Sequence, residues 1–211
     1  PVAGAILENF PKEVEAATSI AYFLGGPLYN GSVRFDDEIL LADSLFFRTM
    51  GIEVLSGNPE DELVQPDVIF LSDRLAQKIF GGENPIGKVL SYNKEITFTV
   101  KGTYAALPEN TTMRPEGVVS MPTAWSRSWG NYSWRGGDSY YEYIRFRPGA
   151  DKEIINARLD DMIQKYRPEE DKKAYGYTAF VKPIRDVYRN EDQVKRMDSI
   201  CLLYTSDAAD E

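Results

Sequence analysis

The residues whose types and spacing come closest to a chemical motif lie at 82–88. This segment, GENPIGK, has the glycine and lysine spacing of a phosphate-binding loop. Val89 follows it where such a loop has a hydroxyl residue for Mg²⁺, and the segment comes after a predicted helix. A phosphate loop instead follows a strand and opens a helix, whose N-terminus then faces the anion. We therefore predict a turn at 82–88 and no nucleotide site.

Nucleophilic catalysis has little basis in this sequence. Ser72, in the segment LSDR, is a candidate nucleophile, but the chain contains no histidine. A Ser-His-Asp or Cys-His centre therefore cannot form, and the usual zinc sites lose their commonest ligand. Because Ser72 stands between a predicted strand and a predicted helix, we interpret it as the residue that caps the helix.

Two acidic clusters are candidate Ca²⁺ ligands. Neither has the ligand spacing of a calcium-binding loop, so we interpret both as solvated turns. A carboxylate pair for glycoside hydrolysis stays open as an alternative, although a chain with 33 acidic residues always contains suggestive pairs. The sequence thus predicts no catalytic, cofactor-binding or metal-binding residue. The two clusters are Asp36, Asp37 and Glu38, and Glu60, Asp61 and Glu62.

Aromatic residues gather around a polar loop predicted at 129–138. Flat rings with polar tips can bind a sugar or a peptide, so this cluster is a candidate binding platform. The interpretation that we favour is that the rings cover the core beneath the loop. The cluster consists of Trp125, Trp129, Tyr132, Trp134, Tyr140 and Tyr141.

The composition is that of an ordered domain. The 211 residues are 43% hydrophobic, which is enough to bury a core, and the net charge of −9 argues against nucleic-acid binding. No run of 18 apolar residues is present, so no segment of this sequence is expected to span a bilayer.

The tail at 201–211, CLLYTSDAADE, looks like the translation of a transposase-type sequencing adapter. We expect the natural chain to continue past about Ile200 into a different sequence and to begin upstream of Pro1. The tail contains the only cysteine, Cys201, and three acidic residues. Without it, 24 basic residues face 30 acidic ones, which gives a net charge of −6. A natural segment without cysteine suits an extracytoplasmic location.

The elements that must position these residues follow from hydrophobic periodicity and from turn residues. The opening of the pattern predicts a helix over 3–9, a strand over 15–24, a hairpin of strands 33–35 and 38–42, and a short helix between Asp43 and Gly51. The middle predicts an extended piece and loop over 53–65, a strand at 68–71, a helix ending at Gly81, a hairpin of 88–91 and 95–104, and a crossing segment at 107–115. The rest predicts a strand at 117–121, a helical turn at 122–126, a strand at 140–147, a helix at 151–166 and a strand at 175–184.

Five segments in this order make the chain similar to a known family. They are NFPKEVEAAT from Asn9, LLADSLFFRTMGIEVLSGN from Leu40, VIFLSDRLAQKIFGGENPIGK from Val68, TVKGTYAALPENT from Thr99, and KPIRDVY from Lys182. Their succession resembles the periplasmic core domain of MacB-like ABC transporter permeases, also called FtsX-like permeases. The resemblance extends over about 9–188, and its most specific parts are the segments at 42–47 and 71–88.

This resemblance implies an α+β fold in which a Porter-like α/β subdomain carries an inserted, mainly β, Sabre-like subdomain. We expect the Porter-like subdomain at 1–35 and 116–200, the Sabre-like insert at 36–115, and a non-native tail at 201–211. The crossing segment predicted at 107–115 agrees with the end of such an insert. The resemblance brings no catalytic residue, because the family's domain has none.

The function implied is that of an extracytoplasmic permease domain at the periplasmic face of the bacterial inner membrane. In the family, one transmembrane helix precedes the domain and three follow it, and the permeases work as dimers with an ABC ATPase. They pass ATP-driven motion outward for efflux of peptides or toxic compounds, for lipoprotein release, or for activation of cell-wall hydrolases. A periplasmic adaptor or substrate is a further expected partner. The alternative is a soluble extracytoplasmic module that binds a sugar or peptide through the aromatic cluster.

Overall fold

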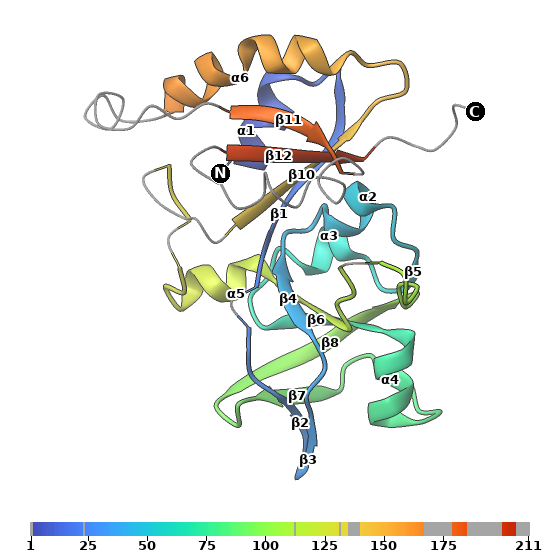
Figure 1. Ribbon diagram of the computed structural model, residues 1–211. Helices are drawn as coiled ribbons and strands as arrows, with labels where there is room; N and C mark the ends of the chain where they lie inside the picture. Colours follow the sequence, from blue (N-terminus) through green and yellow to red (C-terminus); the bar gives the residue numbers. More distant parts are fainter. Residues whose placement is uncertain are drawn as a thin grey trace. The chain divides into compact units, whose positions relative to one another are not determined.

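The structure is a computed structural model that describes residues 2–22, 24–111, 113–130, 132–134, 140–166, 179–184 and 200–205 (Figure 1). The chain forms two compact units. One, the continuous unit, consists of residues 20–130. The other, the split unit, combines residues 1–19 with residues 131–211, so the continuous unit is inserted into its chain. The continuous unit spans more residues than the Sabre-like insert predicted at 36–115. The assignment of the Porter-like and Sabre-like subdomains remains a prediction.

The split unit is a sheet with helices packed against it. In this sheet β12 lies between β10 and β11 and is parallel to both, and β1 neighbours β10. Its core joins apolar side chains of both helices, such as Ile6 and Leu159, to Ile144 of β10. The elements are α1 (Val2–Asn9), β1 (Val14–Ala21, whose last two residues belong to the continuous unit), β10 (Tyr140–Phe146), α6 (Lys152–Tyr166), β11 (Ala179–Pro183) and β12 (Ile200–Thr205).

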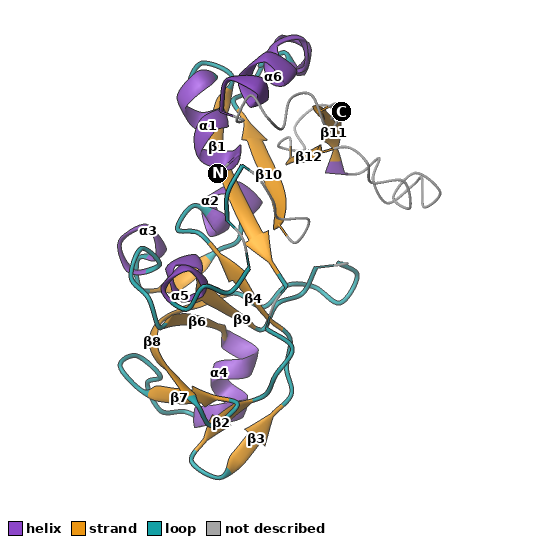
Figure 2. Ribbon diagram, turned by 90° about the vertical axis from the view of Figure 1, so that its left-hand side faces the viewer, coloured by secondary structure: helices purple, strands orange, loops and turns teal. Residues whose placement is uncertain are grey.

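The continuous unit is a mixed sheet in the order β4-β9-β6-β8-β7-β2-β3, with β5 paired to β8 and the end of β1 paired to β4 (Figures 1 and 2). Its strands are β2 (Leu28–Asn30), β3 (Val33–Phe35), β4 (Ile39–Ala42), β5 (Val54–Ser56), β6 (Val68–Ser72), β7 (Val89–Tyr92), β8 (Ile96–Tyr104) and β9 (Gly117–Ser120). Its helices are α2 (Phe46–Met50), α3 (Pro59–Glu62), α4 (Asp73–Phe80) and α5 (Met121–Ser126).

The predicted strand–helix segment at 68–88 is confirmed. All five residues of β6 are buried, and Ser72 caps α4 because its Oγ accepts the N–H of Leu75 at 2.9 Å. Gly81 ends the helix at a φ of +62°, a conformation that glycine adopts at little cost. The hairpin of β7 and β8 is also confirmed, and Asn93 and Lys94 turn it with positive φ angles.

The hairpin predicted between 33–35 and 38–42 is wrong. Strand β3 pairs with β2 instead, and the turn between them contains Asn30-Gly31, with Gly31 at a φ of +59°. Strand β4 enters the sheet between β1 and β9, antiparallel to the first and parallel to the second. The reason is that all four residues of β4 are apolar and buried, which suits an interior strand and not one arm of an exposed hairpin.

Three local features differ in detail from the sequence predictions. Asn58 accepts the N–H of Glu60 at 3.2 Å and starts α3, where we predicted only loop. Asp43 accepts the N–H of Leu45 at 3.1 Å, yet the N-cap of α2 is Leu45 and the helix starts at Phe46, two residues later than a cap at Asp43 would place it. Strand β12 falls on the tail predicted to be non-native, and the origin of that tail stays a prediction.

Candidate functional site

The segment at 82–88 is a turn, and its lysine side chain and a backbone N–H contact other groups of the protein. The ammonium group of Lys88 pairs with Glu83 and lies 4.9 Å from the centre of the Phe80 ring. The N–H of Gly87 donates to the carbonyl oxygen of Val100 at 2.8 Å. The segment follows helix α4 and leads into strand β7, whereas a phosphate loop follows a strand and opens a helix.

The acidic clusters are paired with cations. Asp36 bonds Arg34 at 2.6 Å, which lowers the pKa of that carboxyl group, and Asp37 bonds Lys78 at 2.7 Å. In the second cluster, Glu62 lies 3.2 Å from Lys101. Among the residues that the structure describes, no three Asp, Glu, Cys or His side chains come close enough to hold a metal ion. The first cluster is therefore best explained as an ion-paired surface turn. The turn predicted for the second cluster is wrong, because Glu60, Asp61 and Glu62 belong to helix α3, where acidic side chains suit the first turn.

The predicted aromatic cluster is divided between the two units. In the continuous unit, Trp129 packs beside Tyr92 at 6.5 Å between ring centres. In the split unit, Trp134 stacks on Tyr166 of α6 at 4.9 Å and 9°, against the buried core. Tyr132 meets Tyr140 edge to face at 5.0 Å. Residues 131 and 135–138 of the predicted loop lie outside the described residues. Trp134 thus covers a core, as favoured from the sequence.

Glu142 is a buried carboxylate that the sequence analysis missed. It stands on β10 at 7% exposure, and its Oε2 accepts the Ser19 hydroxyl at 2.6 Å and the Ala3 N–H at 3.2 Å. Burial and the Glu142 charge raise the pKa of Tyr140. The available signal was a single carboxylate in the run YYEYIRF, whose other residues are apolar or aromatic except for Arg145. Because its partners come from α1 and β1, we interpret Glu142 as a structural link within the split unit.

Besides the bonds around Glu142, a second polar network lies at one edge of the continuous unit's sheet. We call it the edge clamp. It consists of Glu38, Ser72, Asp73, Arg74, Tyr104, Pro115 and Glu116. These residues stand where β4 and β9 begin and where β6 and β8 end. The residue types at this edge suit the ends of strands. Ser72 and Asp73 form the corner that starts α4, and Pro115 has no N–H to donate within a central strand.

Hydrogen bonds join every part of the edge clamp. One carboxylate oxygen of Glu116 accepts the Ser72 hydroxyl and the other accepts the Arg74 guanidinium, which raises the pKa of Arg74. The Ser72 N–H also donates to the Glu116 carbonyl at 2.8 Å. The buried Tyr104 hydroxyl donates to the Pro115 carbonyl at 2.7 Å, and burial raises its pKa well above the usual value. Ser72 is therefore a cap and a crosslink in this network.

Fold and site together define an α+β domain of two units whose polar networks hold chain segments together. A family model described as the MacB-like periplasmic core domain matches residues 1–162. The chain therefore belongs to the MacB-like periplasmic core domain family, which is that of a periplasmic domain of ABC transporter permeases and not of a catalytic domain. Within the part of the chain that the structure describes, no helix has both the length and the apolar character needed to cross a bilayer.

Solved structures agree with this assignment. A Porphyromonas gingivalis structure described as a permease-protein domain is 27% identical, with a TM-score of 0.66, and the match covers 82% of this chain and 73% of that one. The periplasmic region of MacB from Actinobacillus actinomycetemcomitans shares the fold at 17% identity, with a TM-score of 0.57 and 82% and 79% coverage.

A third structure of the same fold is the extracellular domain of the noncanonic ABC-type transporter YknZ from Gram-positive bacteria. It is 15% identical, with a TM-score of 0.53, and the match covers 79% of this chain and 83% of that one. A comparison with curated proteins finds no significant match. The predicted family and the α+β fold class are thereby confirmed.

Proposed function

We propose that this domain transmits ATP-driven motion of membrane helices to the outside of the cytoplasmic membrane, as part of a full-length permease anchored in that membrane. The observation that carries the proposal is the family match over residues 1–162. The insertion of residues 20–130 into the chain of the split unit adds support, because both ends of the continuous unit then join the same neighbouring unit. A body held at two points can follow a movement at its base.

The partners that we propose follow from the family. They are an ABC ATPase, reached through the membrane helices of the full permease, and a second permease chain. Export, release of a substrate, or engagement of a periplasmic adaptor would be the outcome of the movement. A binding platform made from the aromatic cluster has less support, because its residues belong to two different units and Trp134 packs against a core.

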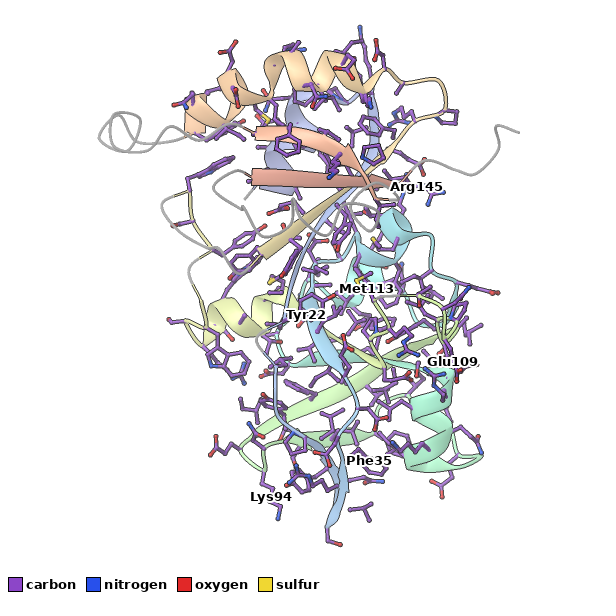
Figure 3. The ribbon with its side chains drawn as sticks, in the orientation of Figure 1. Tyr22, Phe35, Lys94, Glu109, Met113 and Arg145 are labelled. Carbon is purple, nitrogen blue, oxygen red and sulfur yellow. The ribbon has the colours of Figure 1, made fainter. Side chains whose placement is uncertain are left out.

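Spin-label distances in the full permease test the proposal. Glu109 is exposed on the crossing segment (Figure 3), and Glu109→Cys adds one labelling site to residues 1–200, which contain no cysteine. In membranes with the partner ATPase, we expect the distance distribution between two labelled copies to change on ATP binding. The control is an ATPase variant that cannot bind nucleotide. Identical distributions with and without ATP, in a permease that still supports ATP turnover, would refute transmission through this domain.

A further inference from the structure

Two chain connections that are far apart in sequence meet at the edge clamp. One leads from β3 into β4 through Glu38. The other leads from β8 to β9 and contains the crossing segment predicted at 107–115; from here on, that name covers the whole connection at 105–115, of which residues 105–111 and 113–115 are described. The Glu116 N–H donates to the Glu38 carbonyl at 2.8 Å. Beside this bond, Asp37 pairs with Lys78 of α4 at 2.7 Å. Both connections are therefore fastened to the corner between β6 and α4.

Glu116 makes two side-chain contacts in this region, one with Ser72 and one with Arg74. Its side chain is 12% exposed, whereas that of its partner Arg74 is 48% exposed. Its other partner, Ser72, is completely buried. A carboxylate that accepts one bond on each oxygen from two different types of donor fixes both position and orientation. The middle of the crossing segment has a different character, because Pro108, Glu109 and Asn110 are all exposed.

The end of the crossing segment lies over a buried aromatic cluster. Tyr104 is fully buried and donates its hydroxyl to Pro115, the residue before Glu116. Its ring is 5.0 Å from that of Phe47, which in turn lies 5.6 Å from Phe70. Asp73 accepts the N–H of Ala106 at 3.0 Å and so holds the other end of the segment. Release of these bonds would uncover the polar end of the cluster while the strands beneath it stay paired.

From this arrangement we infer that Glu116 is a latch, and that the crossing segment opens as a local unit when the latch is released. Its described residues are bonded near both ends, at Ala106 and beside Glu116, and 108–110 between them are exposed, which is the arrangement of a region of low local stability on a stable sheet. The latch gives the continuous unit a second conformational state, in which the crossing segment is released while the strands of the sheet stay paired. The inference goes beyond the proposed function and does not depend on it.

Hydrogen–deuterium exchange on the 211-residue chain tests the latch, with Glu116→Gln as the variant. It keeps the shape of the side chain and removes its charge. We expect about tenfold faster exchange in the crossing segment, because a charge-assisted bond to Arg74 is lost. Exchange in β7 and the first half of β8 should stay unchanged. The matched control is Glu109→Gln, which removes an exposed carboxylate from the same segment (Figure 3).

Two results would overturn the inference. One is exchange in Glu116→Gln no faster than in Glu109→Gln. The other is a uniform rise over residues 20–130, which would make Glu116 a contributor to overall stability and not a latch. If Glu116→Gln fails to fold, Arg74→Met removes the latch's half-exposed partner instead. Faster exchange confined to the crossing segment then supports the inference, and unchanged exchange contradicts it.

Discussion

Ser72 and Glu116 are connected through both backbone and side chain, although 44 positions separate them in sequence. The Ser72 N–H donates to the Glu116 carbonyl oxygen at 2.8 Å, and the Ser72 hydroxyl donates to the Glu116 carboxylate. The same hydroxyl oxygen accepts the N–H of Leu75 and caps α4. One serine thus ends a strand, starts a helix and holds the residue that leads into β9.

Replacement of this serine should lower stability by more than the loss of an ordinary helix cap. Loss of a cap costs about 1 kcal/mol, and Ser72→Ala also leaves one Glu116 oxygen without its buried donor, so we expect a loss of about 2–3 kcal/mol. The measurement is the free energy of unfolding from urea denaturation. In a double-mutant cycle with Glu116→Gln, the two losses should be clearly less than additive. Strict additivity would show that the two residues are not coupled.

The second prediction concerns the close approach of the Phe70 ring to the backbone at Gly102. Gly102 pairs with Phe70, and a Cβ atom placed on Gly102 would stand 2.0 Å from a carbon of the Phe70 ring. Gly102→Ala should therefore destabilise the protein by about 3 kcal/mol, because a packed core yields little. Gly82→Ala is the control, since a Cβ atom there meets nothing within 4 Å. Equal stabilities of the two variants would contradict the close approach of the Phe70 ring to Gly102.

The sequence predicted best where local signals agreed. The segment at 68–88 contains an apolar run, a capping serine, a helical apolar face and two glycines, and each feature indicates the same structure. The pairing of β3 with β2 was missed because partner choice depends on burial in the whole sheet, which periodicity within 33–42 does not reveal. The short helix α3 was missed because four residues give almost no periodic signal.

The two polar networks were beyond sequence reasoning for a different reason. Glu142 meets Ser19 across 123 positions, and Glu116 meets Ser72 across 44. Each carboxylate is one of 33 acidic residues, and nothing local marks it as buried. Ser72 was correctly interpreted as a helix cap, but its second partner was invisible. Contacts of this kind depend on topology, which hydrophobic patterning specifies only coarsely.

Tyr104 provides a prediction about alkaline pH. Burial raises the pKa of its hydroxyl well above the usual value near 10. The unfolded chain therefore releases this proton at a lower pH than the folded chain, and the stability that the proton contributes is lost as pH rises above about 10. Tyr104→Phe should be about 1 kcal/mol less stable at pH 8, because the bond to Pro115 is lost. Its urea midpoint should then fall less steeply between pH 9 and 11, and parallel pH profiles would contradict this.

Trp134 tests whether the aromatic residues stabilise the fold or bind a ligand. Its ring stacks on Tyr166 against the core of the split unit, so Trp134→Ala should cost about 2–3 kcal/mol of unfolding free energy. Trp125 is 45% exposed, and Trp125→Ala should cost less than about 1 kcal/mol. Thermal unfolding monitored by circular dichroism gives the comparison. An unchanged stability of Trp134→Ala, together with loss of a saturable sugar-dependent fluorescence change, would favour the binding platform.

The edge strand β11 should depend on two side chains of α6. Asn156 accepts the N–H of Val181 at 2.8 Å, and Asp160 accepts the N–H of Ala179 at 2.8 Å. An edge strand has amides on its open side that lack a neighbouring strand, and these two side chains occupy that role. Asn156→Ala should speed amide exchange at Val181 about tenfold and cost about 1 kcal/mol, since a partly buried donor loses its acceptor. Asp161→Ala, which alters an exposed carboxylate on the same helix, should leave exchange in β11 unchanged. Equal exchange at Val181 in both variants would mean that β11 is held by its strand pairing alone.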